Sequence, residues 1–462
     1  MNKTIKYIDL FAGLGGIRIG LEQALNDAGL IGKCVFTSEI KQHAIDVYKK
    51  NFPDEVIYGD ITKINPKDIP AFDILLAGFP CQPFSSAGSR KGFTDTRGTL
   101  FFSIEEILKA KKPKAFLLEN VEGLVTHDRI DKTKPIGRTL ETILEHLEAL
   151  GYKVSWRLID ASKLGVPQKR KRIYITGSLT DEINLEDLTE TKSLLGDILE
   201  ESPINPTYLT SELAKKLLEK YSPSELVGKQ IKDKRGGKNN IHSWDVELKG
   251  AVSTEQKRLL EAILRQRRRK YWAILKKIKW SDGMPLTLED IASFTLRPLS
   301  PTFRKDCDKL KSNLEDLVKK GYLTYETPKQ AHNNEDLRGY NIVAGKLSFD
   351  ISNILNPDEA TPTLVAMDVT KMAILQGNKF RRLTTREGLR LFGFPETYDI
   401  SPVSYKEAFD LLGNSVSINA VKLVSGRIID AVFIEKNRNV VELPEPTTQY
   451  SLFALDTVSR SV

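Results

Sequence analysis

Three short segments carry side chains that could do covalent chemistry together. Pro80-Cys81-Gln82 offers a thiol, Glu119-Asn120-Val121 offers a carboxyl group, and Gln168-x-Arg170-x-Arg172 adds two cations. A thiolate is a strong nucleophile, and neighbouring cations favour it over the thiol. Carbon 5 of cytosine reacts with electrophiles only after a thiolate adds at carbon 6 and an acid neutralises the charge at ring nitrogen 3. A cysteine beside a carboxyl group is the pair that this chemistry requires.

These segments need a fold that brings strand ends together. The first 180 residues alternate short apolar runs with helical patterns, which predicts an α/β fold with a mostly parallel sheet and helices on both faces. Ligands of such sheets bind at the carboxyl ends of the strands, where the cysteine and the carboxyl group both fall. The expected strands are residues 5–10, 33–38, 55–58, 73–77, 115–118, 153–159 and 172–176. The expected helices are residues 17–28, 41–51, 100–111 and 138–150.

A glycine-rich turn, Asp9-Leu-Phe-Ala-Gly13-Leu-Gly-Gly16, follows the first expected strand. Glycines let the backbone approach a ligand closely, and a helix N-terminus offers free N–H groups. Nicotinamide and flavin enzymes use similar turns, and a turn that serves packing alone is an equally good interpretation. Glu39 is suitably placed to bind ribose hydroxyls and Asp60 to bind an adenine edge, although either carboxylate alone is more often a solvated strand-end residue.

Length and composition restrict the class of protein. The chain has 462 residues, of which 40% are hydrophobic and 28% charged, and it fits two or three globular domains. A formal charge of +8 favours a polyanionic partner. Three cysteines and five histidines, all widely spaced, give neither a disulfide framework nor a metal site. With no signal peptide and no apolar run of the ~18 residues that span a membrane, we expect a cytoplasmic protein without a membrane partner.

The character of the chain changes after residue 180. Charge density rises, and residues 229–238 and 265–270 are strongly basic. A capping box at Ser253 predicts one long helix that runs through the second basic stretch towards Lys277. Two later helices, over residues 287–294 and 302–320, followed by a strand over residues 322–326, suggest a winged-helix-like insert. The expected organisation is a catalytic and cofactor-binding domain (1–180), a recognition domain (181–375), a return segment that completes the first domain (376–436) and a tail (437–462).

Taken together, the motifs resemble those of the bacterial DNA (cytosine-5) methyltransferase family, in that family's order. The resemblance covers nearly the whole chain outside residues 181–360, and chance agreement at six ordered motifs is negligible. The motifs are residues 9–16, 80–82, 119–121, 168–172, 382–395 and 413–416. The resemblance implies a Rossmann-like fold that binds S-adenosylmethionine. It also implies methyl transfer to carbon 5 of a specific cytosine in duplex DNA, within a restriction-modification system.

The resemblance also implies roles for single residues. Cys81 would attack carbon 6 of a base swung out of the duplex, and Glu119 would contact ring nitrogen 3. Arg172 would hold the ring carbonyl, Arg170 would organise Cys81 and the DNA backbone, and Asn120 would position the Pro80–Gln82 loop. The implied cofactor residues are Phe11, Gly13, Leu14, Gly15, Gly16, Glu39, Ile40, Asp60, Ile61, Pro80, Leu100, Asn414, Ser415 and Val416. The implied DNA contacts are Ser85, Ser86, Arg90, Lys91, Arg97, Thr363 and Leu364.

Other functions remain open on the sequence alone. A transfer-RNA methyltransferase shares the fold and motifs but usually has a smaller recognition segment. A catalytically silent DNA-binding protein would not need Cys81, Glu119 and Arg172, and a nicotinamide oxidoreductase would leave Cys81 and Glu119 without purpose. The expected partners are duplex DNA and, in a complete restriction-modification system, an endonuclease of the same specificity. The protein itself is expected to be a monomer.

Overall fold

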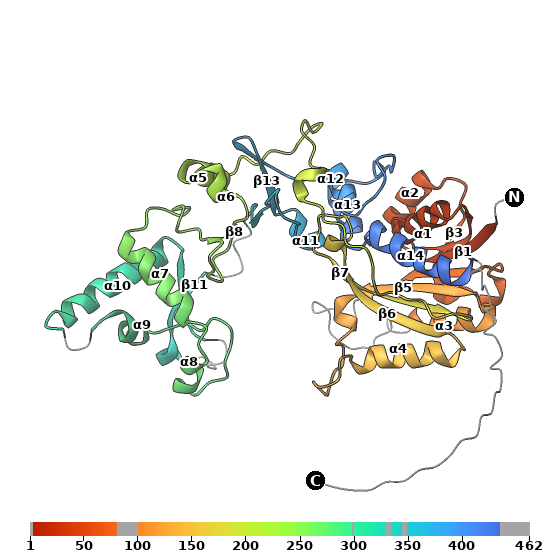
Figure 1. The fold of residues 1–462 in the computed structure, drawn as a ribbon. Helices are drawn as coiled ribbons and strands as arrows, with labels where there is room; N and C mark the ends of the chain where they lie inside the picture. The colour runs from red at the N-terminus through yellow and green to blue at the C-terminus, as the bar shows by residue number, and fades with distance from the viewer. Residues whose placement is uncertain (1–2, 81–99, 298–299, 329–333, 344–348, 435–462) are drawn as a thin grey trace, which may run out of the picture.

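The computed structural model describes residues 3–80, 100–297, 300–328, 334–343 and 349–434. Its first part is built on a seven-stranded sheet in the order β3-β2-β1-β4-β5-β7-β6 (Figure 1). The first five strands in this order are parallel, and β7 runs antiparallel to both β5 and β6. The strands are β1 (Thr4–Leu10), β2 (Ile31–Ser38), β3 (Ile57–Tyr58), β4 (Ile74–Gly78), β5 (Ala115–Val121), β6 (Lys153–Asp160) and β7 (Lys171–Ser178). The predicted α/β fold with a mostly parallel sheet is confirmed.

Helices cover both faces of this sheet, because its central strands are apolar on both sides. One face packs against α1 (Gly16–Asp27) and α14 (Ile418–Val432), and the other packs against α3 (Leu100–Lys111) and α4 (Arg138–Ala149). The chain therefore returns to the first domain at its C-terminal end. Gly20 allows α1 and α14 to approach closely, since a Cβ there would lie 2.6 Å from Val421. The remaining helices of this part are α2 (Gln42–Asn51), α12 (Thr385–Arg390) and α13 (Tyr405–Gly413).

A five-stranded sheet in the order β14-β13-β12-β8-β9 forms the base of the second part. Its strands are short: β8 (Gln230–Ile231), β9 (Asn240–Ile241), β12 (Asn353–Ile354), β13 (Met372–Gln376) and β14 (Lys379–Arg381). The helices α5 (Glu212–Lys220) and α6 (Pro223–Leu226) pack against it, whereas α11 (Ala366–Val369), which precedes β13, packs against α13. In Figure 1 this sheet lies between the seven-stranded sheet and a further group of helices.

That further group has a hydrophobic core of its own, made of residues between Trp244 and Ile342. It contains α7 (Thr254–Gln266), α8 (Lys270–Leu275), α9 (Leu288–Thr295), α10 (Phe303–Lys319), β10 (Leu323–Glu326) and β11 (Gly339–Ile342). The prediction of one long helix from Ser253 to Lys277 is wrong, because the helix breaks between α7 and α8. The carbonyl of Arg267 accepts the N–H of Met284 at 2.9 Å, so a long-range contact takes an acceptor that a continuous helix would use.

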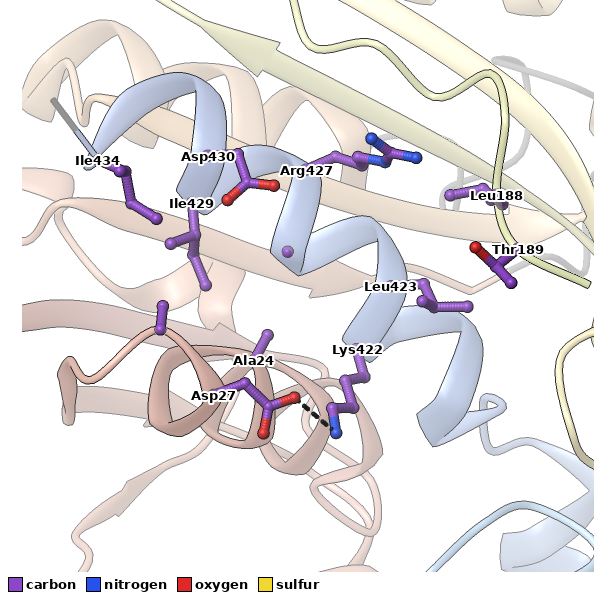
Figure 2. A pocket seen from close by; sticks show the side chains of 12 residues that line it. Ala24, Asp27, Leu188, Thr189, Lys422, Leu423, Arg427, Ile429, Asp430 and Ile434 are labelled. Atoms are coloured by element: carbon purple, nitrogen blue, oxygen red, sulfur yellow. Dashed lines mark ion pairs between the residues drawn. The ribbon is translucent and has the colours of Figure 1, made fainter. Parts of the chain in front are cut away.

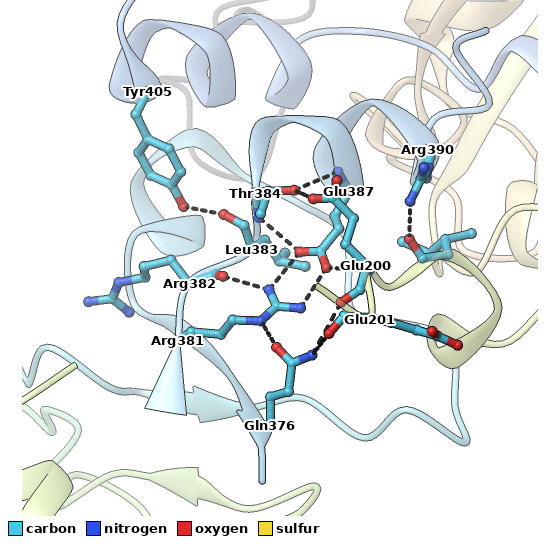
Figure 3. Close-up of polar contacts among 11 residues, drawn as sticks. Glu200, Glu201, Gln376, Arg381, Arg382, Leu383, Thr384, Glu387, Arg390 and Tyr405 are labelled. Carbon is cyan, nitrogen blue, oxygen red and sulfur yellow. Dashed lines mark hydrogen bonds and ion pairs between the residues drawn. The ribbon is translucent and has the colours of Figure 1, made fainter. Parts of the chain in front are cut away.

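A buried ion pair fastens the two parts where the chain passes between them (Figure 3). The Arg381 guanidinium lies 2.6 Å from the Glu387 carboxylate, and the two side chains are 1% and 0% exposed. Glu387 also accepts the backbone N–H of Glu200 at 2.9 Å, and Arg381 donates to the side-chain oxygen of Gln376. Since Gln376 also donates to the Glu200 carbonyl, both crossings of the chain are held by one network.

Candidate active site

The ends of β4 and β5 bring two of the predicted segments together. Gly78 pairs with Glu119 in the parallel register, and a Cβ at Gly78 would lie 3.6 Å from the Glu119 carboxylate. Cys81 follows Gly78 by three residues and lies outside the described residues. The predicted DNA contacts Ser85, Ser86, Arg90, Lys91 and Arg97 also lie outside them. The described structure therefore supplies the carboxyl side of the site and the strand end that leads to the thiol.

The Glu119 carboxyl group is buried and faces an arginine. Its Oε1 lies 3.1 Å from Nε of Arg172, with the two side chains 10% and 15% exposed respectively. Burial raises the pKa of Glu119, and the charges of Arg172 and then Arg170 oppose this rise less strongly. A carboxyl group in this setting retains its proton to a higher pH than an exposed one. It is suited to donating a hydrogen bond to a ring nitrogen.

Asn120 acts on the backbone beside the predicted nucleophile segment. Its side-chain amide donates to the carbonyl of Phe79 at 3.2 Å, and its Oδ1 accepts the N–H of Val121 at 2.9 Å. These bonds hold the residue that precedes Pro80. They support the positioning role predicted for this asparagine.

A cavity of about 460 Å³ opens beside Arg172, between the strand ends and the base of the second part. It is lined by Val121, Glu122, Gly123, Asp160, Lys169, Lys171, Arg172, Thr363 and Val365. Lys169 and Lys171 were not predicted as site residues. Lys169 lies just before β7 and Lys171 is its first residue, and both line the cavity together with Arg172. The lining therefore carries three cations, Lys169, Lys171 and Arg172, and two carboxylates, Glu122 and Asp160.

Arg170 is turned away from this cavity and is only 2% exposed. Its guanidinium donates to the carbonyl of Gly413 at 3.0 Å and to that of Ser415, and it lies over the Phe392 ring. This burial corrects the predicted contact with the DNA backbone. Arg170 instead fastens the C-terminal return segment to the sheet.

The predicted pair Thr363-Leu364 docks the second part against the segment just before β7. Thr363 donates its hydroxyl to the Lys169 carbonyl at 2.5 Å, and the N–H of Leu364 donates to Gln168 Oε1 at 3.2 Å. Thr363 is half-buried and lines the cavity. Leu364 is 0% exposed, so its predicted role as a DNA contact is corrected to that of an apolar anchor.

The glycine turn after β1 is held in shape by Glu39. One carboxylate oxygen accepts the N–H of Gly13 at 2.8 Å, and the other accepts the N–H groups of Ile40 and Lys41 at 2.8 Å. Phe11, Gly13 and Gly15 all have φ between 54° and 72°, which bends the chain sharply. Beside them, the buried Leu14 accepts the hydroxyl of Tyr398 at 2.6 Å through its carbonyl. The turn is thus fixed from two sides.

Two of the remaining predicted cofactor residues, Ser415 and Val416, contact this turn. A Cβ at Gly16 would lie 3.0 Å from Val416 and 3.2 Å from Ser415, so the two distant motifs are in contact. Asp60 accepts two hydrogen bonds from Thr62, which lower the pKa of Asp60. The other members are the 73% exposed Ile40, the buried Ile61, Pro80 beyond the end of β4, Leu100 at the start of α3, and the exposed Asn414.

A buried polar network that the sequence did not reveal lies under the turn. Arg18 forms ion pairs of 3.0 Å with both Glu22 and Glu55, and it donates to the Tyr48 hydroxyl at 3.1 Å. Tyr48 donates to Asp9 at 3.3 Å. Burial raises the pKa of Asp9 to about 7. No motif signals this network, because its members come from separate elements of ordinary composition.

A second cavity, of about 390 Å³, lies between α1 and α14 (Figure 2). It contains the Lys422–Asp27 ion pair of 2.7 Å and none of the predicted site residues. We therefore place the candidate active site at the cavity beside Arg172. Among the described residues, no cluster of three or more His, Cys, Asp or Glu side chains could hold a metal ion. No described helix is long and apolar enough to cross a membrane.

Comparison with known proteins gives one consistent result. The model of the family described as C-5 cytosine-specific DNA methylase matches residues 5–430. The type II methyltransferase M.NlaIV of Neisseria lactamica is 54% identical, over 92% of this chain and 99% of its own length. M.BanI of Aneurinibacillus aneurinilyticus is 40% identical, over 95% and 97% respectively. The solved structure of the Entamoeba histolytica methyltransferase EhMeth, at 18% identity, covers 93% of this chain and 99% of its own with a TM-score of 0.50, and supports the fold alone.

Proposed function

Because the chain belongs to the C-5 cytosine-specific DNA methylase family, we propose that Cys81, Glu119 and Arg172 carry out its reaction on an extruded base. The protein is a type II DNA (cytosine-5) methyltransferase, the modification half of a restriction-modification system. The observation that carries the assignment of residues is the buried Glu119–Arg172 pair, one strand away from the segment that leads to Cys81.

The steps follow from the chemistry of these groups. The Cys81 thiolate forms a bond to carbon 6, and the protonated Glu119 relieves the negative charge at ring nitrogen 3. Arg172 holds the ring carbonyl. Carbon 5 then bonds to the incoming methyl group, loses its proton to a base, and the carbon 6–sulfur bond breaks to restore the aromatic ring. Extrusion of the base costs about a few kcal/mol, which contacts with the DNA must offset.

The family uses S-adenosylmethionine, which supplies the methyl group as an electrophile. The residues around the glycine turn fit such a cofactor. A Cβ at Gly13 would meet nothing closer than 3.9 Å, so space is open above the turn, and the exposed Ile40 offers an apolar surface for a purine ring. We assign binding to Phe11, Glu39, Asp60 and Ile40 with the glycine turn, and to Asn414, Ser415 and Val416 from the return segment.

We also propose the domain organisation expected from the sequence, with one refinement. Ile183 and Leu185 pack in the core of the first domain, so we place the start of the recognition domain nearer residue 200. Three helices (α7, α9 and α10), the antiparallel β10–β11 pair and the bridge from Leu286 to Tyr340 support a winged-helix-like unit within that domain. Lys169 and Lys171 would hold phosphates beside the extruded base.

A covalent trap tests the assignment. Duplex DNA that carries 5-fluorocytosine in the methylated sequence cannot lose the atom at carbon 5, so the intermediate should persist as an adduct that survives denaturation. We expect this adduct with the unchanged protein and the methyl donor, and none with Cys81→Ser. Trapping on RNA but not on DNA would contradict the substrate. An undiminished adduct in Cys81→Ser would contradict the nucleophile.

A further inference from the structure

The most basic part of the chain lies outside the candidate active site. Residues 229–282 contain 16 Lys and Arg and 6 Asp and Glu, a net charge of +10, which exceeds the +8 of the whole chain. The sequence presents two separate basic stretches there. The fold joins them, because Asp282 lies 2.7 Å from Arg268 and 3.8 Å from Arg235.

The cations of this surface are available to a partner. Arg268, Arg269, Lys270, Lys277 and Lys279 are all exposed around α8. One exposed carboxylate, Asp282, is shared between two of the arginines and cannot neutralise the group. A surface of this charge attracts a polyanion, and phosphates at regular spacing are what a row of cations binds best.

The same surface also exposes apolar side chains. Tyr271, Ile274 and Leu275 are 57%, 76% and 55% exposed, and their i, i+3, i+4 spacing places them on one face of α8. The opposite face buries Trp272 and Ala273 in the core. Apolar side chains flanked by cations are typical of proteins that press against a DNA groove while holding its phosphates.

Another face of the same unit is less suited to DNA. The hairpin between β10 and β11, residues 326–338, contains three acidic and two basic residues. On α10, Arg304, Lys305 and Lys309 alternate with Asp306 and Asp308. A polyanion is therefore attracted more strongly to the exposed cations around α8 than to α10 and the hairpin.

We propose that the α8 surface, defined as the exposed residues of 268–279 together with Lys232, Lys234, Arg235 and Lys238, is a second DNA-binding site that grips duplex outside the recognition sequence. Its cations hold phosphates and its apolar row lies against the groove between them. The proposal rests on the proposed function, since it assumes that duplex DNA is the substrate. This second contact increases the affinity for DNA and does not depend on the base sequence.

Duplex length is the variable that tests this site. Binding is measured over a series of salt concentrations with two duplexes that carry the methylated sequence, one short and one longer by about one helical turn, ~10 base pairs, on each side. The unchanged protein should bind the longer duplex more tightly and with a steeper salt slope. Arg268→Ser, Arg269→Ser and Lys277→Ser combined should reduce that slope by about 2 to 3, at about 0.9 per phosphate contact, and leave the short duplex unaffected.

Matched variants locate the grip. Arg304→Ser, Lys305→Ser and Lys309→Ser combined remove the same charge from α10 and should leave both duplexes unaffected. Ile274→Ser with Leu275→Ser should weaken binding of the long duplex about threefold or more with an unchanged salt slope. Asp282→Asn should strengthen it. Equal losses in the α8 and α10 variants, or losses on the short duplex alone, would overturn the assignment.

The same samples separate failure of this site from failure of the proposed function. A protein that methylates DNA but binds both duplexes alike has no second site. A protein that methylates neither duplex has a different substrate. Long duplex RNA is added as a competitor. If it displaces the long DNA duplex as well as unlabelled long DNA does, the surface recognises phosphates in any duplex, and the assignment of this site to DNA is overturned.

Discussion

Glu119 is useful only while it carries a proton, and its surroundings favour the protonated form. Burial raises the pKa of Glu119, with Arg172 as the main opposing charge. A group that must be protonated to act loses its effect as the pH rises through its pKa, so a raised pKa keeps Glu119 active to higher pH. Glu119→Gln retains a hydrogen-bond donor but cannot transfer a proton.

We expect Glu119→Gln to lower the rate of methyl transfer by about 10²- to 10⁴-fold. In the unchanged protein the rate should fall at high pH as Glu119 loses its proton, and this fall should be absent from the pH profile of the variant. The measurement is the single-turnover rate as a function of pH, because it separates chemistry from product release. Tight binding of the duplex should persist. A variant with the unchanged rate would show that the acid lies elsewhere.

Asp9 gives a residue-scale prediction about stability. Burial raises the pKa of Asp9 to about 7 from an ordinary value of 3.8. Between these values the folded protein keeps a proton that the unfolded chain releases, so Asp9 makes stability fall as the pH rises from about 4 to about 7. The total effect is about 4 kcal/mol, at about 1.4 kcal/mol for each unit of pKa.

Asp9→Asn removes this titration and keeps an acceptor for Tyr48. We expect the variant to gain stability relative to the unchanged protein across that pH window and to differ least near pH 4. Denaturant unfolding at each pH measures it. If the difference does not grow with pH, Asp9 is ionised in the folded protein.

At this scale the sequence predicted residue types well and their partners poorly. Glu119 and Arg172 were predicted to share a site, and they lie 3.1 Å apart. Arg170 and Leu364 were given DNA contacts, and both are buried. The spacing of residues in the sequence predicts which element a side chain belongs to. Whether that side chain is buried depends on which distant segment of the chain packs over it. For Arg170 that segment is residues 413–415, more than 240 positions away.

At the scale of elements, the link between the two sheets depends on the Arg381–Glu387 pair (Figure 3). Both side chains are fully buried, and removal of one would leave the other charged without a partner. Such losses cost about 3–5 kcal/mol, whereas replacement of both by apolar residues of similar volume is often nearly neutral. We therefore expect Arg381→Ala to destabilise strongly and Arg381→Met with Glu387→Leu to recover part of the loss, because the double variant still leaves the Glu200 N–H and the Gln376 oxygen without their partners. Chemical denaturation measures both, and additive losses in the double variant would contradict a direct pairing.

Elements were predicted best where local and long-range preferences agree. The helix expected over residues 100–111 has those bounds, and the strands of the sheet differ by a few residues at their ends. The prediction of one helix from Ser253 to Lys277 was wrong because the local sequence favours helix over this whole range and contains no signal for the break between α7 and α8. The break is set by Met284, whose N–H binds the Arg267 carbonyl. A contact of this kind leaves no mark in local composition.

At the scale of the whole molecule, the chain has separate hydrophobic cores. Leu314 is fully buried in the core of residues 244–342, and Leu117 is fully buried in the core beside the seven-stranded sheet. Chains with separate cores need not unfold in one cooperative step. The second DNA contact proposed above would lie on the smaller unit, so its stability bears on DNA binding and not on the catalytic cavity.

Leu314→Ala and Leu117→Ala test this independence. Each should cost about 2–5 kcal/mol, from lost burial and the cavity that remains. We expect calorimetry to show two transitions, with Leu314→Ala lowering only the one that belongs to residues 244–342 and Leu117→Ala lowering only the other. Leu314→Ala should also weaken binding of the long duplex at temperatures above its own transition, while the short duplex is still methylated. A single transition that both variants lower equally would mean that the insert and the catalytic domain fold as one unit, and the grip on DNA would then be coupled to catalysis.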